Sequence, residues 1–174
     1  MCLMTNTFAK IRKFFIIPLI CLGFFSCIPE ESFPPETILE FQRVQFWVDA
    51  VNRDSLVGIS LLIRFQDGNG NIGNIAPDTT HNLFVHVFDR ISLTDTIYVP
   101  MQTIHPTSPE NWVKSFAVPN LGSGSVSGTF DVGFFDDFPL LQRAELGIVR
   151  FEIYMFDRDS VQSNRVITPD IHIR

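Results

Sequence analysis

The sequence predicts an all-β domain of antiparallel strands, because apolar and polar residues alternate along several segments and no segment carries a sustained helical stripe. Within 57–65 every odd position is apolar, and the positions between them include Gly58, Ser60 and Arg64. A period of two places one face of a strand in a core and the other toward water. Clusters of Gly, Pro, Asn and Asp separate such segments, as turns do between short strands.

The strands are expected in one domain that spans 38–174. Three segments alternate clearly, namely 57–65, 126–134 and 149–155. Weaker strands are expected at 38–49, 82–89, 94–100, 111–119 and 165–173. The apolar phase of the first weak strand changes between Phe41 and Val44, which predicts a bulge or a switch between sheets. Only 140–146 offers a short helical turn.

Seven or eight short antiparallel strands in one domain predict an immunoglobulin-like β-sandwich. A closed barrel is the competing arrangement.

Residues 1–26 have the organisation of an export signal. Three basic residues stand at its start, Lys10, Arg12 and Lys13. An apolar run over 14–25, too short to span a bilayer, follows them, and Ser26 precedes Cys27. The ending FFSC resembles the cleavage box of Bacteroidota lipoproteins. The resemblance implies cleavage before Cys27, acylation of its thiol and attachment to the outer membrane. An uncleaved anchor or a buried helix is the alternative.

Residues 27–37 are expected to form a tether between lipid and domain, because their prolines and glutamates favour an extended spacer. Glu30 and Glu31 resemble the acidic tags that send some Bacteroidota lipoproteins to the outer face of the outer membrane. An ordinary solvated linker explains them equally well.

Removal of the signal leaves 10 basic against 19 acidic residues, a formal charge of −9. This balance argues against a nucleic-acid partner, whose phosphates need basic side chains. It suits divalent cations, although solubility alone also explains an acidic surface. Only Cys27 remains in the mature chain, so an intramolecular disulfide or a cysteine metal site is excluded.

The segment that follows the clearest strand carries a candidate calcium site. Asp67, Asn69 and Asn71 stand at positions 1, 3 and 5 of a glycine-rich loop, the spacing at which calcium loops turn oxygens inward. The glycines of 68–73 also fit G-x-G-x-x-G, but a turn-forming run with Pro77 follows where a dinucleotide site needs a helix.

The segments FQDGNGNIG (65–73) and FEIYMFDRDSVQSNRVITPDI (151–171) resemble a group of small Bacteroidota lipoproteins whose loop more often reads DGDGDIG. Asn69 and Asn71 replace two of those aspartates, which predicts weak calcium binding or none. The alternative is a tight hairpin-type turn in which Asx side chains bond their own backbone.

Strand alternation predicts where further calcium ligands lie. If each strand reverses direction, the loop after Phe135 falls at the same end as Asp67, so Asp136 or Asp137 completes the shell. The same rule sends Asp157, Asp159 and Asp89 to the opposite end. The run Asp157–Ser160 is interpreted as a polar turn.

The sequence favours a noncatalytic binding or assembly module for an envelope protein, because no motif of a catalytic nucleophile or a catalytic metal site is present. The run 122–128 lacks the serine of G-x-S-x-G, and the four histidines lack metal-ligand spacing. The alternatives are a surface glycan-binding accessory protein, with Trp47 and Tyr154 stacking on sugar, and an accessory hydrolase with an unrecognised site.

Overall fold

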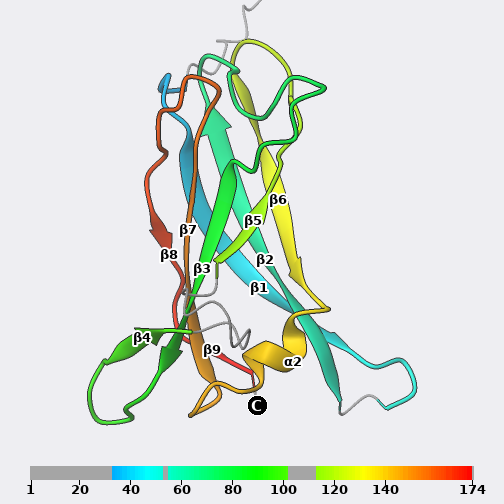
Figure 1. Ribbon diagram of the computed structural model, residues 1–174, viewed down its shortest axis with the longest axis vertical. Helices are drawn as coiled ribbons and strands as arrows, with labels where there is room; N and C mark the ends of the chain where they lie inside the picture. Colours follow the sequence, from blue (N-terminus) through cyan, green and yellow to red (C-terminus); the bar gives the residue numbers. More distant parts are fainter. Residues whose placement is uncertain (1–32, 53–54, 102–112, 174) are drawn as a thin grey trace, which may run out of the picture. The chain divides into compact units, whose positions relative to one another are not determined.

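The computed structural model describes residues 33–52, 55–101 and 113–173, and within them it confirms the all-β prediction (Figure 1). The first six strands are β1 (Ile38–Val48), β2 (Leu56–Asp67), β3 (Leu83–Arg90), β4 (Tyr98–Pro100), β5 (Val113–Phe116) and β6 (Val126–Phe134). One helical turn, α2 (Phe138–Leu141), precedes β7 (Ile148–Met155), β8 (Val166–Ile167) and β9 (Ile171–His172).

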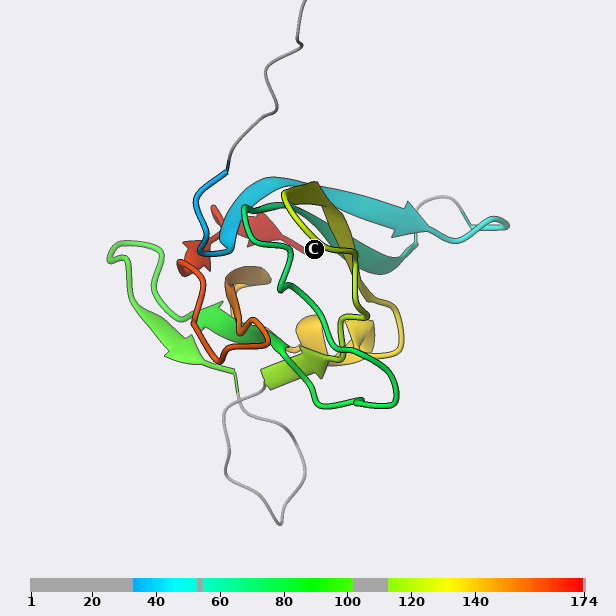
Figure 2. The same cartoon turned by 90° about the horizontal axis from the view of Figure 1, so that it is seen from above.

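These strands form two open antiparallel sheets rather than one closed sheet. One sheet has the order β1-β2-β6, and the other has the order β4-β3-β7-β8, with β5 also beside β3 and β9 also beside β7. Figure 2 shows the two sheets as layers that face one another. Pairing of the first, second and sixth strands in one layer corresponds to strands A, B and E of an immunoglobulin-like sandwich. Pairing of β3, β7 and β8 corresponds to C, F and G.

The side chains predicted to point inward fill the space between the layers. Ile59, Leu61 and Ile63 of β2 are fully buried, as are Phe151 and Ile153 of β7. The sheets meet directly where the rings of Phe134 and Phe151 lie 5.1 Å apart between centroids. The alternation seen in the sequence therefore supplies one face of each layer.

Two irregularities have local causes. The pairing of β1 with β2 shifts register between Phe41 and Arg43, where the sequence predicts a bulge. The predicted last strand is divided into β8 and β9, which both pair with β7. Between them the Thr168 hydroxyl, instead of a backbone carbonyl, accepts the backbone N–H of Phe151. Pro169 has no N–H to continue the ladder.

Strands β4 and β5 run in the same direction, although they follow one another in the sequence. Both strands pair antiparallel with β3, β4 with Phe88–Arg90 and β5 with Leu83–His86, so they run in the same direction along one edge. As a result β6 runs antiparallel to β2, with Asp67 opposite Val126 and Ile59 opposite Phe134. The loop after β2 therefore lies at the same end as the start of β6, not at its finish.

The first described residues pack against the loop that follows β2. The carbonyl of Pro34 accepts the N–H of Gly68 at 2.8 Å, and Thr37 is buried. The end of the sandwich that carries these contacts is called the N-terminal end. The signal, Cys27 and the start of the tether lie outside the described residues. Across the described ranges no helix has the length and apolarity needed to cross a membrane.

Candidate functional site

The loop after β2 is organised by Asp67, the first of the predicted calcium ligands. Its side chain is fully buried. Its Oδ1 atom accepts the backbone N–H groups of Asn69 at 3.1 Å and Gly70 at 2.6 Å, and its Oδ2 atom accepts the hydroxyl of Thr37 at 2.8 Å. Asp67 is thus an Asx cap whose oxygens are already engaged by protein donors.

Asn69 repeats this pattern, because its Oδ1 atom accepts the N–H of Asn71 at 3.0 Å. Gly70 and Gly73 have φ of 68° and 78°, as the turn interpretation expects of glycine. The predicted bonding of Asx side chains to their own backbone is therefore confirmed. The turn is not a hairpin, however, because the loop leads from β2 in one sheet to β3 in the other.

Asn71 joins this loop to the loop that follows β7. Its Nδ2 atom donates to the Oδ2 atoms of Asp157 at 2.9 Å and Asp159 at 2.7 Å. Asp157 is buried, and its Oδ1 atom accepts the N–H groups of Asp159 and Val161. The predicted placement of Asp157 and Asp159 at the opposite end from Asp67 is therefore wrong.

Arg158, in the loop after β7, joins the same two loops through backbone carbonyls of the loop after β2. One guanidinium nitrogen, Nη2, donates to the carbonyl of Gly70 at 2.7 Å. The other, Nη1, lies 3.3 Å from the carbonyl of Gly73 and 3.1 Å from Oδ1 of Asn120. The run Asp157–Ser160 thus acts as a clamp across the N-terminal end, and not only as a polar turn.

The predicted approach of Asp136 and Asp137 to Asp67 is also wrong. These residues follow β6, whose last residues pair with the start of β2, so they lie at the other end of the sheet from Asp67. The cause is the missing reversal between β4 and β5. Asp137 is instead paired with Lys114 at 2.6 Å, and Asp136 is exposed. Within the described part of the chain, no three acidic, histidine or cysteine side chains gather as a metal site.

Trp47, predicted as a sugar-stacking residue, lies on the outer face of the first sheet in a row of three. It pairs across the strands with Gly58, and its indole N–H donates to the Ser60 hydroxyl at 3.3 Å. The ring of Phe135 lies over Gly58 and Gly133, where an added Cβ would come within 2.5 Å of it. Trp47 and Phe135 meet edge to face, with centroids 5.7 Å apart.

This row belongs to a larger exposed surface, which is called the apolar end. Its members are between 40% and 55% exposed: Phe46, Trp47, Val48, Val57 and Phe135. By register Phe46 shares the inner face with Ile59, whereas Trp47 shares the outer face with Gly58. Apolar side chains therefore emerge from both faces of the sheet, at the opposite end from Asp67.

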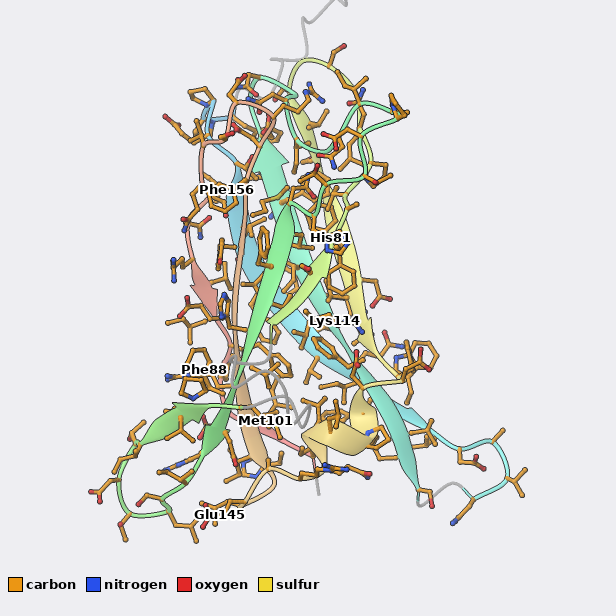
Figure 3. The ribbon with its side chains drawn as sticks, viewed as in Figure 1. His81, Phe88, Met101, Lys114, Glu145 and Phe156 are labelled. Carbon is orange, nitrogen blue, oxygen red and sulfur yellow. The ribbon has the colours of Figure 1, made fainter. Side chains whose placement is uncertain are left out.

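Tyr154, the second predicted stacking residue, lies on the outer face of the second sheet, and its ring is already in contact with protein. Phe84 and His86 stack against it at centroid distances of 5.4 and 5.5 Å, and Arg165 lies 4.7 Å from the ring centroid. The His86 ring also hydrogen-bonds its hydroxyl. Figure 3 marks the extent of this aromatic face with Phe156 toward the N-terminal end and Phe88 further down.

Sequence reasoning missed Phe46 and Phe135 as surface residues. The pair Phe134–Phe135 held a signal, because in a strand one of two adjacent phenylalanines must face outward. It also missed the contact of Asn71 with Asp157, which are 86 residues apart and share no local pattern.

Searches against protein families, curated proteins and solved structures return no match to this chain.

Proposed function

We propose that this chain is a lipid-anchored, noncatalytic binding module of the cell envelope that holds a partner protein at its apolar end. The observation that carries the proposal is the gathering of five large apolar side chains there, each at least 40% exposed. Exposed apolar clusters of this kind in a folded domain mark interaction sites. Aromatic residues are the commonest anchors of such interfaces.

The anchor follows from the sequence pattern at Cys27, and the fold supports its use. The first fixed backbone contact of the described chain is the bond between Pro34 and Gly68 at the N-terminal end. Cys27 stands seven residues before Pro34, and a chain of that length reaches at most about 24 Å. The 11 residues of β1 then extend about 36 Å toward the apolar end.

The anchor is tested by exchanging the acylated thiol. Wild-type chain is expected in the membrane fraction with a mass that shows loss of residues 1–26 and addition of acyl groups. Cys27→Ser is expected to lose both, because a serine hydroxyl is not the thiol that acylation requires. A full-length, unmodified wild-type chain in the soluble fraction would refute anchoring and leave the surface proposal to be judged separately.

The partner surface is tested by polar substitution at the apolar end. Phe46→Ser and Val48→Ser together are expected to abolish recovery of a partner from detergent-solubilised envelopes, because each buried side chain contributes about 1.5–3 kcal/mol. Ile75→Ser is the matched control, since Ile75 is 59% exposed in the loop after β2, away from the apolar end. Equal recovery of the same partner by wild type, by the doubly substituted protein and by the Ile75→Ser control would refute the proposal.

A glycan is the second candidate ligand, and the Trp47–Gly58–Phe135 row favours it. The rings of Trp47 and Phe135 are 40% and 47% exposed and meet edge to face, with Phe135 lying over Gly58, so their outer surfaces offer a platform for the apolar face of a sugar ring. Trp47→Ala is expected to weaken retention on immobilised envelope polysaccharide, while Phe46→Ser, on the other face, is expected to leave it unchanged. If the ligand is a protein instead, Phe46→Ser is expected to weaken its binding.

A further inference from the structure

The edge of the first sheet is closed along the first half of β1 and open along the second half. Strand β1 pairs with β2 alone. Near its start the side-chain amide of Asn164 holds both backbone groups of Leu39, accepting the N–H at 2.7 Å and donating to the carbonyl at 2.9 Å. Beyond the bulge, no described residue outside β2 hydrogen-bonds the backbone of 44–48. An open strand edge of this kind accepts a further strand.

The backbone groups that face the open edge belong to Val44, Phe46 and Val48. The N–H of Asp49 turns toward β2, because the carbonyl of Ser55 accepts it at 2.8 Å. Backbone groups along an antiparallel strand alternate in direction. Those of Val48, and of every second residue before it as far as the bulge, therefore point away from β2 and toward the open edge.

The side chains along the open edge are exposed on both faces of the sheet. Phe46 and, by alternation, Val48 lie on the inner face and are 46% and 55% exposed, whereas Trp47 lies on the outer face and is 40% exposed. Figure 2 shows the end of β1 projecting past the second layer. A partner laid against one face would cover only one of these sets. A strand added at the edge extends both faces at once and packs its side chains against both sets.

The charges at the two ends of this segment are complementary to those of a second copy. Arg43 and Asp49 flank 44–48. Arg43 is exposed, and none of the ion pairs among the described residues includes it. The Oδ1 atom of Asp49 accepts the N–H groups of Val51 and Asn52, and its Oδ2 atom accepts no donor from the described residues. When two copies pair antiparallel, the first residue of one segment lies opposite the last residue of the other.

We propose that two copies of this chain pair antiparallel along the open half of β1, about a two-fold axis at Phe46. The inference rests on the proposed function, because it identifies the partner of the apolar end as a second copy. Each Phe46 then lies opposite its own copy, each Val44 lies opposite Val48, and each Arg43 lies opposite Asp49. A shift of the axis by one residue also suits the backbone, but it separates Arg43 from Asp49. Charge therefore selects the register, and opposite charges directly across strands are stabilising.

A cysteine at the axis tests the register. Paired Cα atoms at a hydrogen-bonded position lie about 5.5 Å apart, within the range of a disulfide. The full-length Phe46→Cys chain in detergent is expected to form a dimer on mild oxidation, which a reductant reverses. Gln42→Cys, exposed on the same strand, is the matched control. It is expected to form no more dimer than wild type, because the pairing places its two copies about 27 Å apart along the strands. Equal yields from both variants would overturn the proposal.

Substitution of Arg43 tests the charge pairs without a cysteine, by light scattering of the full chain in detergent over a range of concentrations. Arg43→Glu is expected to raise the dissociation constant of the dimer about tenfold, because both cross-strand pairs become like-charged, and Arg43→Lys is expected to keep the dimer. A dimer that Arg43→Glu leaves unchanged would overturn the pairing. A monomeric wild type would also overturn it, and would leave the proposed function standing if Phe46→Ser with Val48→Ser still loses a different envelope protein.

Discussion

Thr37 donates its hydroxyl to the Oδ2 atom of Asp67 at 2.8 Å, and both residues are buried. This bond fixes the residue before β1 to the last residue of β2. Asp67 in turn holds the backbone of the loop that carries Asn71. The point where the chain joins the sandwich is therefore connected directly to the loop clamp at the N-terminal end.

Thr37→Val is expected to lower the free energy of unfolding by about 1–3 kcal/mol, because it keeps the side-chain shape but leaves a buried carboxylate oxygen without its donor. Urea unfolding measures the difference. Thr129→Val is the control, since Thr129 is exposed on β6 and should change stability little. A Thr37→Val protein as stable as wild type would show that the bond contributes nothing.

Gly73→Ala and Gly124→Ala separate the two costs of replacing a glycine. Both glycines have φ of 78°, so alanine at either position lowers the free energy of unfolding by about 1–2 kcal/mol through its unfavourable backbone conformation. At Gly73 the added Cβ also collides with the carbonyl oxygen of Pro119, whereas at Gly124 nothing lies within 4 Å. Gly73→Ala is expected to cost at least about 2 kcal/mol more in thermal or urea unfolding. Equal losses would contradict the close packing of this loop.

The phenol of Tyr98 is expected to titrate late. Its hydrogen bond to Asp170 raises its pKa above the ordinary value of about 10, and burial and the charge of Asp170 act in the same direction. Only the protonated phenol donates, so this contribution to stability is complete below pH of about 10 and is lost as the pH rises through the higher pKa.

Ultraviolet titration checks this in Tyr154→Phe, which leaves Tyr98 as the only tyrosine. Asp170→Asn in the same background should lower the pKa, because it removes the charged acceptor. An unchanged titration curve would show that Asp170 does not set the pKa of Tyr98.

Local patterns made most of the fold predictable. The segments 57–65, 126–134 and 149–155 fall within β2, β6 and β7, because alternation of side chains is a property of each strand alone. The bulge near Phe41 was predictable for the same reason, since a bulge shifts the apolar phase.

Relations between distant segments were not predictable from those patterns. The placement of Asp136 failed because β4 and β5 share one edge of β3, a pairing that leaves no periodic trace. The Asx turn at Asn69 was foreseen from local chemistry, but the contact of Asn71 with Asp157 depends on which loops meet. The exposure of Phe46 likewise depends on how far the second sheet extends to cover the first.

Site-specific photo-crosslinking in intact cells tests the central claim most directly. A photoreactive side chain at Val57 or Phe135, in the apolar end, is expected to give one discrete heavier adduct. The same group at Thr129, exposed on the outer face of β6 but outside the apolar end, is expected to give none. Identical adduct patterns from all three positions, or none from Val57 and Phe135, would contradict a binding surface at the apolar end.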